Sequence, residues 1–455
     1  MRSRDFSVAM LESIDSGLRG HLLRSDGQED LAFGLYRTVI GASRDTALLT
    51  QIILPVDDDR LVHGNVSFGA AYLERVLNIA RQMNAGVFFI HSHPHGRGWQ
   101  GMSEDDEIAE RRLAPAALAA TSLPLVGLTM GGGDFRYSAR RWQRAEIRVY
   151  HRQDAESVRV VGDHLSVSLP PRSVLPNSAF DRTELVWGKA GREVLTRLRL
   201  GIVGLGSVGS VVGEISARTG IERLTLVDGD RTELLNLDRT LNADKSSIGE
   251  YKCDVAAIAL TAHAPASIEI KVVNEKCDND EAYAALLDCD FIFCCVDRPW
   301  ARRILNQLSY ANAIPISNGG LLARMRKGRF IGADWHVHTV GPTRRCLQCW
   351  KAFDQTDAAL DRDGLLDDPS YVKELDPNSP LVAHANAMPF AMNVASLQFM
   401  QFAAMVLGPI HNLGDCNFHA ATGTTDVTAD PGCLAGCVYS TITGDPGSIP
   451  PLKAR

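Results

Sequence analysis

The segment LRLGIVGLGSVGSVVGEISARTGIERLTLVDGD (residues 198–230) decides the fold of its part of the chain. An apolar run leads into three glycines at Gly204, Gly206 and Gly209, a helix-like run follows, and a second apolar run ends at Asp228. A strand, a tight glycine turn and a helix N-terminus can together receive a phosphate group, because backbone amides and the helix dipole favour an anion there. The segment therefore predicts an α/β fold of the nucleotide-binding kind.

A third apolar run, Phe291-Ile-Phe-Cys-Cys-Val-Asp297, comes about seventy residues later, which suits a parallel sheet wound by crossover helices. The glycine turn alone does not define the ligand. Dinucleotide dehydrogenases use the same turn with an acid about twenty residues on, where Asp228 lies, to hold a ribose. A dehydrogenase is therefore an alternative at this point.

Further polar residues follow Asp228 at once, in Asp228-Gly-Asp-Arg-Thr-Glu-Leu-Leu-Asn-Leu-Asp-Arg239. A second acid, an amide and an arginine are not needed by a dehydrogenase, but they suit an enzyme that handles a triphosphate with Mg²⁺. The run resembles Asp-x-Asp-x-Val-Glu-x-Ser-Asn-Leu-Asn-Arg of the ThiF/MoeB and ubiquitin-activating enzyme family. Two more family positions follow in order, Lys252 and Asp297, and the resemblance extends from about Phe180 to about Gly408.

This resemblance implies a Rossmann-like domain that adenylates a protein C-terminus with ATP and Mg²⁺. By resemblance Asp228 holds the ribose, Asn236, Arg239 and Lys252 contact phosphates, and Asp297 positions Mg²⁺ at the α-phosphate. Arg239, Lys252 and Asp297 are then also catalytic, because the charge of the triphosphate must be neutralised before a carboxylate can attack it. The full set implied for nucleotide and metal is Gly204, Gly206, Gly209, Asp228, Asp230, Asn236, Arg239, Lys252 and Asp297.

Arg182, in Phe180-Asp-Arg, resembles the arginine that in this family reaches the γ-phosphate bound by the neighbouring subunit. That resemblance implies a catalytic role and an active homodimer. The alternative is a surface arginine ahead of a helix.

The N-terminal part predicts a different, mixed α/β unit. Strand-like runs at residues 31–36 and 47–54 precede a helical pattern at residues 70–83 and a buried strand at residues 85–90. That strand leads into His91-Ser-His93-Pro, and Ser103-Glu-Asp-Asp106 follows. Histidines at i and i+2 of an extended segment point to one face, and a carboxylate from a following helix can complete a three-ligand zinc set that leaves a position for water.

These residues resemble the JAMM motif of the JAB/MPN metalloprotease family, in which a glutamate precedes His-Ser/Thr-His-Pro and Ser-x-x-Asp. The resemblance covers about the first 150 residues and implies a zinc isopeptidase. By resemblance His91, His93 and Asp106 bind catalytic Zn²⁺, Ser103 helps to hold the oxyanion, and Glu29 moves the proton to the leaving amine.

Three points remain open for this motif. Glu74 is a rival to Glu29, but it lies on the helical segment, where an exposed charge is the ordinary explanation, so Glu29 is favoured. Nine residues separate His93 from Ser103, where the family has about seven, which predicts a small loop at the site mouth. The alternative for the whole set is a strand that ends in two histidines and a helix capped by Ser103.

Among ten cysteines, Cys346-Leu-Gln-Cys349 and Cys433-Leu-Ala-Gly-Cys437 have spacings that suit metal binding. Together they resemble the four-cysteine structural zinc of the ThiF/MoeB family; reduced thiols are the alternative. Some relatives form a thioester on a loop between such pairs, and Cys416, which lies late in that interval, is the candidate here.

The length of 455 residues favours two or three domains. Three prolines in residues 169–178 disfavour regular structure there. We expect a JAB/MPN-like domain at residues 1–165, a proline-rich linker at residues 166–178 and a ThiF/MoeB-like domain at residues 179–455.

Bulk composition restricts the partners. A hydrophobic content of 45% and a charged content of 22% indicate a globular chain. The net charge of −7 disfavours nucleic acid as a partner, and we recognise no signal peptide and no apolar run of about eighteen residues. We therefore expect a cytoplasmic protein without a membrane partner.

The two resemblances predict complementary reactions: a peptidase frees a protein C-terminus, and an adenylyltransferase activates the carboxylate. The hypothesis is a chain that processes or deconjugates a ubiquitin-like protein and also adenylates it, with a conjugating enzyme as a further partner. Such fusions resemble those of bacterial ubiquitin-like operons, and this resemblance suggests an antiphage or stress role. The alternatives are activation of a sulfur-carrier protein in biosynthesis, with release of product by the JAB-like domain, and a scaffold with one inactive site.

Overall fold

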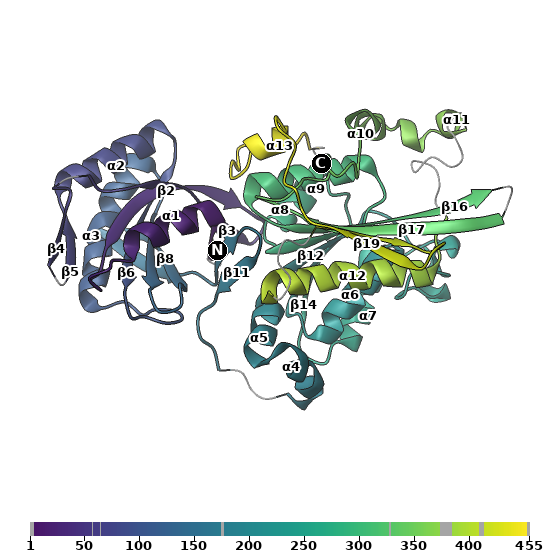
Figure 1. The fold of residues 1–455 in the computed structure, drawn as a ribbon, viewed down its shortest axis with the longest axis horizontal. Coiled ribbons are helices and arrows are strands. Elements are labelled where there is room, and N and C mark those ends of the chain that lie inside the picture. Colours follow the sequence, from purple (N-terminus) through teal and green to yellow (C-terminus); the bar gives the residue numbers. More distant parts are fainter. Residues whose placement is uncertain are drawn as a thin grey trace. The chain divides into compact units, whose positions relative to one another are not determined.

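The computed structural model describes residues 4–56, 58–63, 65–173, 177–326, 329–373, 385–408 and 414–452. The chain divides into two compact units, residues 1–175 with 444–446 and residues 176–443 with 447–455 (Figure 1). We call them unit 1 and unit 2.

The predicted linker at residues 166–178 begins too early. Strand β11 (Leu165–Ser168) pairs antiparallel with β10 (Val158–Val161), so the sheet of unit 1 continues almost to the first proline. Residues 174–176 of the predicted linker lie outside the described residues.

Unit 1 is built on a nine-stranded mixed sheet, and the predicted mixed α/β character is confirmed. Strand β6 (Gly86–His93) lies between β2 and β7 and is buried along nearly its whole length, as its aromatic and β-branched residues favour. Helix α1 packs on one face of the sheet, and α2 and α3 pack on the other. The strand order is β11-β10-β1-β3-β2-β6-β7-β8-β9, with β1 Asp5–Leu11, β2 Leu31–Ile40, β3 Arg44–Ile53, β7 Leu125–Gly131, β8 Tyr137–Glu146 and β9 Val149–Asp154; the helices are α1 Glu12–Leu22, α2 Ala70–Gln82 and α3 Glu104–Thr121, and β4 Arg60–His63 pairs with β5 Asn65–Phe68.

Unit 2 has an eight-stranded sheet in the order β14-β13-β12-β15-β16-β17-β18-β19. The first five strands are parallel and the last three are antiparallel additions. Figure 1 shows α9 above this sheet and α6, α7 and α12 below it. The strands are β12 Arg199–Val203, β13 Arg223–Val227, β14 Glu269–Val273, β15 Phe291–Cys294, β16 Ile316–Arg326, β17 Arg329–Val340, β18 Asp415–His419 and β19 Thr424–Thr428.

The helices of unit 2 connect these strands and cover both faces. They are α4 Asp181–Trp187, α5 Lys189–Arg197, α6 Ser207–Thr219, α7 Lys252–His263, α8 Asp280–Leu286, α9 Pro299–Asn312, α10 Gln355–Arg362, α11 Pro369–Val372, α12 Met388–Leu407 and α13 Val438–Thr441. The chain order reverses between β12 and β15, and doubly wound sheets bind ligands at such a switch point, along the edge formed by the carboxyl ends of the strands.

Helix α6 begins at Ser207, because Gly204 turns the chain at a φ of 89° and Gly206 is the N-cap residue of the helix. One predicted boundary at this edge differs from the structure. Strand β15 ends at Cys294, so Asp297 follows the strand in a connecting segment instead of ending it.

Helix α12 is, by length and composition, the one helix of the described residues that could cross a membrane, with a hydropathy of 1.4 in its most apolar window. The prediction that no apolar run approaches eighteen residues missed it because polar uncharged residues interrupt the run. These residues face the sheet: Gln398 Nε2 donates to the carbonyls of Cys294 and Ser317, and Gln401 Nε2 to that of Val337. Such bonds are those of a core helix.

Candidate functional sites

Three side chains converge in unit 1 at the end of β6. His91 and His93 leave the strand on one face, and Asp106 reaches them from the first turn of α3. The two Nε2 atoms lie 3.2 Å apart, and the carboxylate oxygens of Asp106 lie 3.6 Å from His91 Nε2 and 3.8 Å from His93 Nε2. Two imidazoles and one carboxylate at this spacing fit a catalytic zinc set that keeps a position open.

Ser103 caps α3, as the structural alternative for this residue predicts. Its Oγ accepts the backbone N–H of Asp106 at 3.2 Å and donates to Asp106 Oδ2 at 2.7 Å, and the Ser103 N–H bonds the same carboxylate. The capping box therefore orients Asp106 toward the histidines.

Charge also gathers at this cluster. Burial alone would raise the pKa of Asp106. The hydrogen bonds with His91 and His93 outweigh burial, so the pKa of Asp106 lies far below its usual range. The contact with Asp106 raises the pKa of His93, and Glu29 adds to the shift by its charge. Glu29 is half-buried and acts on His93 by its charge, whereas Glu74 is exposed on α2.

The three glycines of unit 2 differ in what surrounds them. A Cβ on Gly209 would lie 1.8 Å from the carbonyl oxygen of Gly204, and Gly204 itself has a positive φ, so both positions require glycine. A Cβ on Gly206 would meet no atom within 4 Å. Gly206 therefore leaves open space at the N-terminus of α6, where a phosphate would bind.

Asp228 connects the glycine turn with the segment that follows β13. Its Oδ2 accepts the N–H of Leu205 at 2.6 Å and its Oδ1 accepts the N–H of Asp230 at 2.8 Å. Burial raises the pKa of Asp228, and the charge of Lys252 opposes that shift. The carboxylate is thus fixed beside the glycine turn.

Lys252 lies among three carboxylates. Its Nζ is 2.9 Å from Asp230 Oδ2. Burial lowers the pKa of Lys252, but the negative charges of Asp228, Asp230 and Asp297 outweigh it and raise the pKa above its usual value. The structure therefore brings together Gly206, Asp228, Asp230, Lys252 and Asp297 around one strand edge.

The remaining predicted residues of this site are Asn236, Arg239 and Arg182. Asn236 Oδ1 accepts the N–H of Glu233, and Arg239 pairs with Asp238 at 2.9 Å, so their described bonds stay within one short segment. Arg182 is exposed on α4 and, within the described residues, no contact joins it to the glycine turn.

Asn386 is a residue that the sequence prediction missed. Its Nδ2 donates to Ser207 Oγ at 2.7 Å, at the first residue of α6 and directly after Gly206. No sequence signal points to it, since 179 positions separate the two residues.

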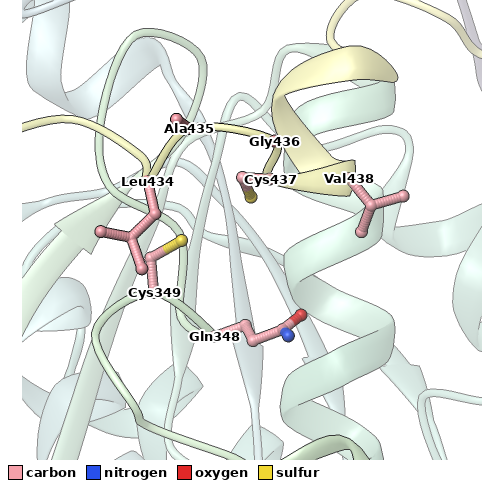
Figure 2. Close-up of a pocket in the computed structure, with 7 residues that line it drawn as sticks. All are labelled: Gln348, Cys349, Leu434, Ala435, Gly436, Cys437 and Val438. Atoms are coloured by element: carbon pink, nitrogen blue, oxygen red, sulfur yellow. The ribbon is translucent and has the colours of Figure 1, made fainter.

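The four predicted cysteine ligands come together. The sulfurs of Cys346, Cys349, Cys433 and Cys437 all lie within 4.8 Å of one another, and the Cys346 N–H donates to Cys433 Sγ at 3.3 Å. A hydrogen bond from Cys346 lowers the pKa of Cys433 to about 5. Figure 2 shows Cys349 and Cys437 at a surface pocket with Gln348 and the segment 434–438. The donor set fits a closed tetrahedral zinc site.

Three buried thiols outside the four-cysteine group are poor nucleophiles. Burial raises the pKa of Cys294 to about 11 and raises the pKa values of Cys253 and Cys277 further. Cys416 lies in strand β18, not on a loop, and burial together with the charge of Asp415 raises its pKa.

The fold and the glycine turn define unit 2 as a nucleotide-binding α/β domain of the doubly wound class. The chain belongs to the ThiF family, because the family model matches residues 180–427, more than half of its 455 residues.

Among curated relatives, the molybdopterin-synthase adenylyltransferase of Escherichia coli is 35% identical over 133 residues, 29% of this chain and 53% of that protein. The tRNA threonylcarbamoyladenosine dehydratase of Bacillus subtilis is 41% identical over 76 residues, 17% of this chain and 30% of that protein. The adenylyltransferase and sulfurtransferase UBA4 of Eremothecium gossypii is 29% identical over 160 residues, 35% of each chain. The matches thus span about half or less of the curated relatives.

Proposed function

We propose that unit 2 is an ATP-dependent adenylyltransferase that activates the C-terminal carboxylate of a ubiquitin-like or sulfur-carrier protein. The main support for this proposal is the position of Lys252 among Asp228, Asp230 and Asp297, beside the open space at Gly206. Membership of the ThiF family and the names of two of the relatives, both adenylyltransferases, support this proposal.

In the proposed reaction a carboxylate oxygen bonds to the α-phosphorus of ATP, the bond to the β-phosphate oxygen breaks, and pyrophosphate leaves. Bound Mg²⁺ would supply charge neutralisation at the phosphates, with Asp297 as its ligand. The amides of the glycine turn receive phosphate oxygens, Asp228 accepts the ribose hydroxyls, and Lys252 offsets negative charge as it develops.

Arg239 and Asn236 are proposed as further phosphate contacts. Arg182 is proposed to act on the nucleotide of a second copy, because within its own chain no described contact brings it to the turn. An active homodimer is part of this proposal.

Pyrophosphate exchange tests the adenylation directly. With Mg²⁺ and the cognate carrier, label moves from pyrophosphate into ATP only if an acyl-adenylate forms. Exchange with one carrier, lost when its C-terminal residue is removed, supports the proposal; absence of exchange with every candidate carrier by a zinc-loaded, ATP-binding chain contradicts it. Formation of a thiocarboxylate with a sulfur donor, instead of a conjugate, distinguishes a sulfur carrier from a ubiquitin-like modifier.

We also propose that unit 1 is a JAB/MPN-type zinc isopeptidase that processes or deconjugates the same carrier. The convergence of His91, His93 and Asp106 supports it. Zinc bound there would make a water nucleophilic near neutral pH. Glu29 would move the proton to the leaving amine, and Ser103 would stabilise the oxyanion in addition to capping α3.

A carrier fused at its C-terminus to a reporter tests this second activity. Cleavage that requires zinc and disappears in Glu29→Gln, while Glu74→Gln cleaves normally, supports the assignment; a zinc-loaded chain that leaves carrier fusions and conjugates intact contradicts it. We further propose a structural zinc at the four cysteines, a cytoplasmic location and a conjugating enzyme as a partner.

A further inference from the structure

The nine residues between His93 and Ser103 form an ordered loop beside the three converging ligands. The carbonyl of His93 accepts the N–H of Gly96 at 2.9 Å, and Gly98 N–H donates to Asp134 Oδ2 at 2.7 Å. The Trp99 side chain packs against the hydrophobic core of unit 1. The loop is therefore held near its start by the hydrogen bond of Gly96 and in its middle by the hydrogen bond of Gly98 and the packing of Trp99.

A run of three glycines makes room for this loop. Gly132 N–H donates to the His93 carbonyl and Gly133 N–H donates to the Gly96 carbonyl, both at 2.9 Å. A Cβ on Gly131 would lie 2.8 Å from the Gly96 oxygen, and one on Gly132 would lie 2.5 Å from the Pro94 oxygen. The backbone of the loop thus sits against a turn that accepts no side chains, which fixes its path.

Gln100 occupies the end of this loop in one defined orientation. Its Nε2 donates to the carbonyls of Arg97 at 2.6 Å and Gly98 at 3.1 Å, so the amide nitrogen is committed to the loop. Its Oε1 then faces Nδ1 of His93 at 3.4 Å. A carbonyl oxygen can only accept, so Nδ1 of His93 must carry the proton.

The consequence falls on the opposite nitrogen of the ring. A neutral imidazole with its proton on Nδ1 has a free lone pair on Nε2, the atom that faces His91 Nε2 and Asp106. Metal-binding histidines generally have an oxygen partner on the other nitrogen, and losing that partner weakens metal affinity 10- to 100-fold.

We infer that Gln100 is a positioning residue that fixes His93 in the tautomer able to bind a metal, and that the long loop exists in this chain to supply it. The inference rests on the proposed zinc site of unit 1. The plain alternative is that Gln100 only closes the loop through its two backbone bonds.

Gln100→Leu removes the acceptor together with the two bonds to the loop carbonyls, whereas Gln100→Glu keeps an acceptor and loses only those two bonds, so the pair separates the two roles. Arg97→Ala is the matched control, because it lies in the same loop and keeps the Arg97 carbonyl that Gln100 uses. Thermal unfolding of each variant checks that unit 1 remains folded.

The first readout is the tautomer of His93 in metal-free chain, observed by ¹⁵N NMR of histidine-labelled protein and assigned with His93→Gln. The spectra are recorded at a pH above the raised pKa of His93, so that the ring is neutral and carries one proton. We expect the Nδ1–H form in the natural chain, Arg97→Ala and Gln100→Glu, and a shift toward Nε2–H in Gln100→Leu. An unchanged tautomer in Gln100→Leu, or an equal shift in Arg97→Ala, overturns the inference.

The second readout is the zinc affinity of unit 1, measured by competition with a chelator. Because the chain is proposed to bind two zinc ions, the affinity is taken from the binding step that Asp106→Asn abolishes. We expect about 10- to 100-fold weaker binding in Gln100→Leu and a change of less than about twofold in the control. Unit 1 that binds no zinc at all contradicts the proposed peptidase, whereas the tautomer readout still decides the role of Gln100.

Discussion

The Nζ of Lys252 lies 2.9 Å from Asp230 Oδ2, and the backbone N–H of Lys252 donates to the Asp230 carbonyl at 3.0 Å. The lysine side chain is 13% exposed and the aspartate 62%, so a fixed cation is paired with a carboxylate at the solvent boundary. An incoming phosphate can therefore replace Asp230 as the partner of Lys252 without burying a new charge.

Lys252→Met should lower pyrophosphate exchange by about 10²- to 10³-fold, because it removes a fixed positive charge from the developing transition state. The free energy of unfolding should change by only about 1 kcal/mol, since the ion pair is partly exposed. Lys245→Met, on an exposed lysine of the neighbouring segment, should exchange normally. Equal rates for the two variants would remove Lys252 from the mechanism.

Substitution by alanine should weaken ATP binding at Gly206 and should lower the stability of unit 2 at Gly209. Gly206→Ala should fold normally, because its Cβ meets no atom, and should weaken ATP binding at least about tenfold by blocking close approach of a phosphate. Gly209→Ala should destabilise unit 2, because its Cβ meets the Gly204 carbonyl. Thermal unfolding with and without MgATP separates the two effects; normal ATP stabilisation of Gly206→Ala would be the contrary result.

Elemental analysis should find two zinc ions per chain, one in each unit. Asp106→Asn should retain one, because the amide can still cap α3 through Ser103 but is a poor metal ligand. Cys433→Ser should lose the other and lower the melting temperature of unit 2, since zinc at 1,000 times its dissociation constant stabilises a fold by about 4 kcal/mol. Retention of two ions by either variant would exclude its site.

Cys416→Ala should leave pyrophosphate exchange within about twofold, and mixtures with ATP and carrier should show no thiol-sensitive adduct that depends on Cys416. The thiol lies in β18 with its pKa raised by burial and by Asp415, so little thiolate forms. A reducible adduct on non-reducing gels, absent from Cys416→Ala, would restore the thioester hypothesis.

Local patterns predicted much of the fold and of both sites. The period and composition of β6, the glycine turn before α6 and the capping sequence at Ser103 act over a few residues, so the sequence contains what determines them. These local elements carry His91 and His93, Asp106 and the three glycines of the turn.

Contacts between distant residues were predicted only where the family resemblance supplied them, as for the four cysteines. The antiparallel strands β17 to β19 have no motif of their own and are defined by pairing across the sheet. The contact of Asn386 with Ser207, the orientation of Gln100 and the burial of α12 all arise from tertiary packing. The predicted action of Arg182 requires a second copy of the chain, so the contacts within one chain do not define it.

The composition of α12 has a consequence during biosynthesis. Until β16 and β17 have formed, the carboxamides of Gln398 and Gln401 lack the strand carbonyls that they bond, and a 20-residue uncharged segment is exposed. Molecular chaperones and protein-quality-control proteases recognise exposed apolar segments of this kind. Mutations that delay closure of this sheet should therefore reduce the cellular abundance of the protein before they reduce its catalytic rate.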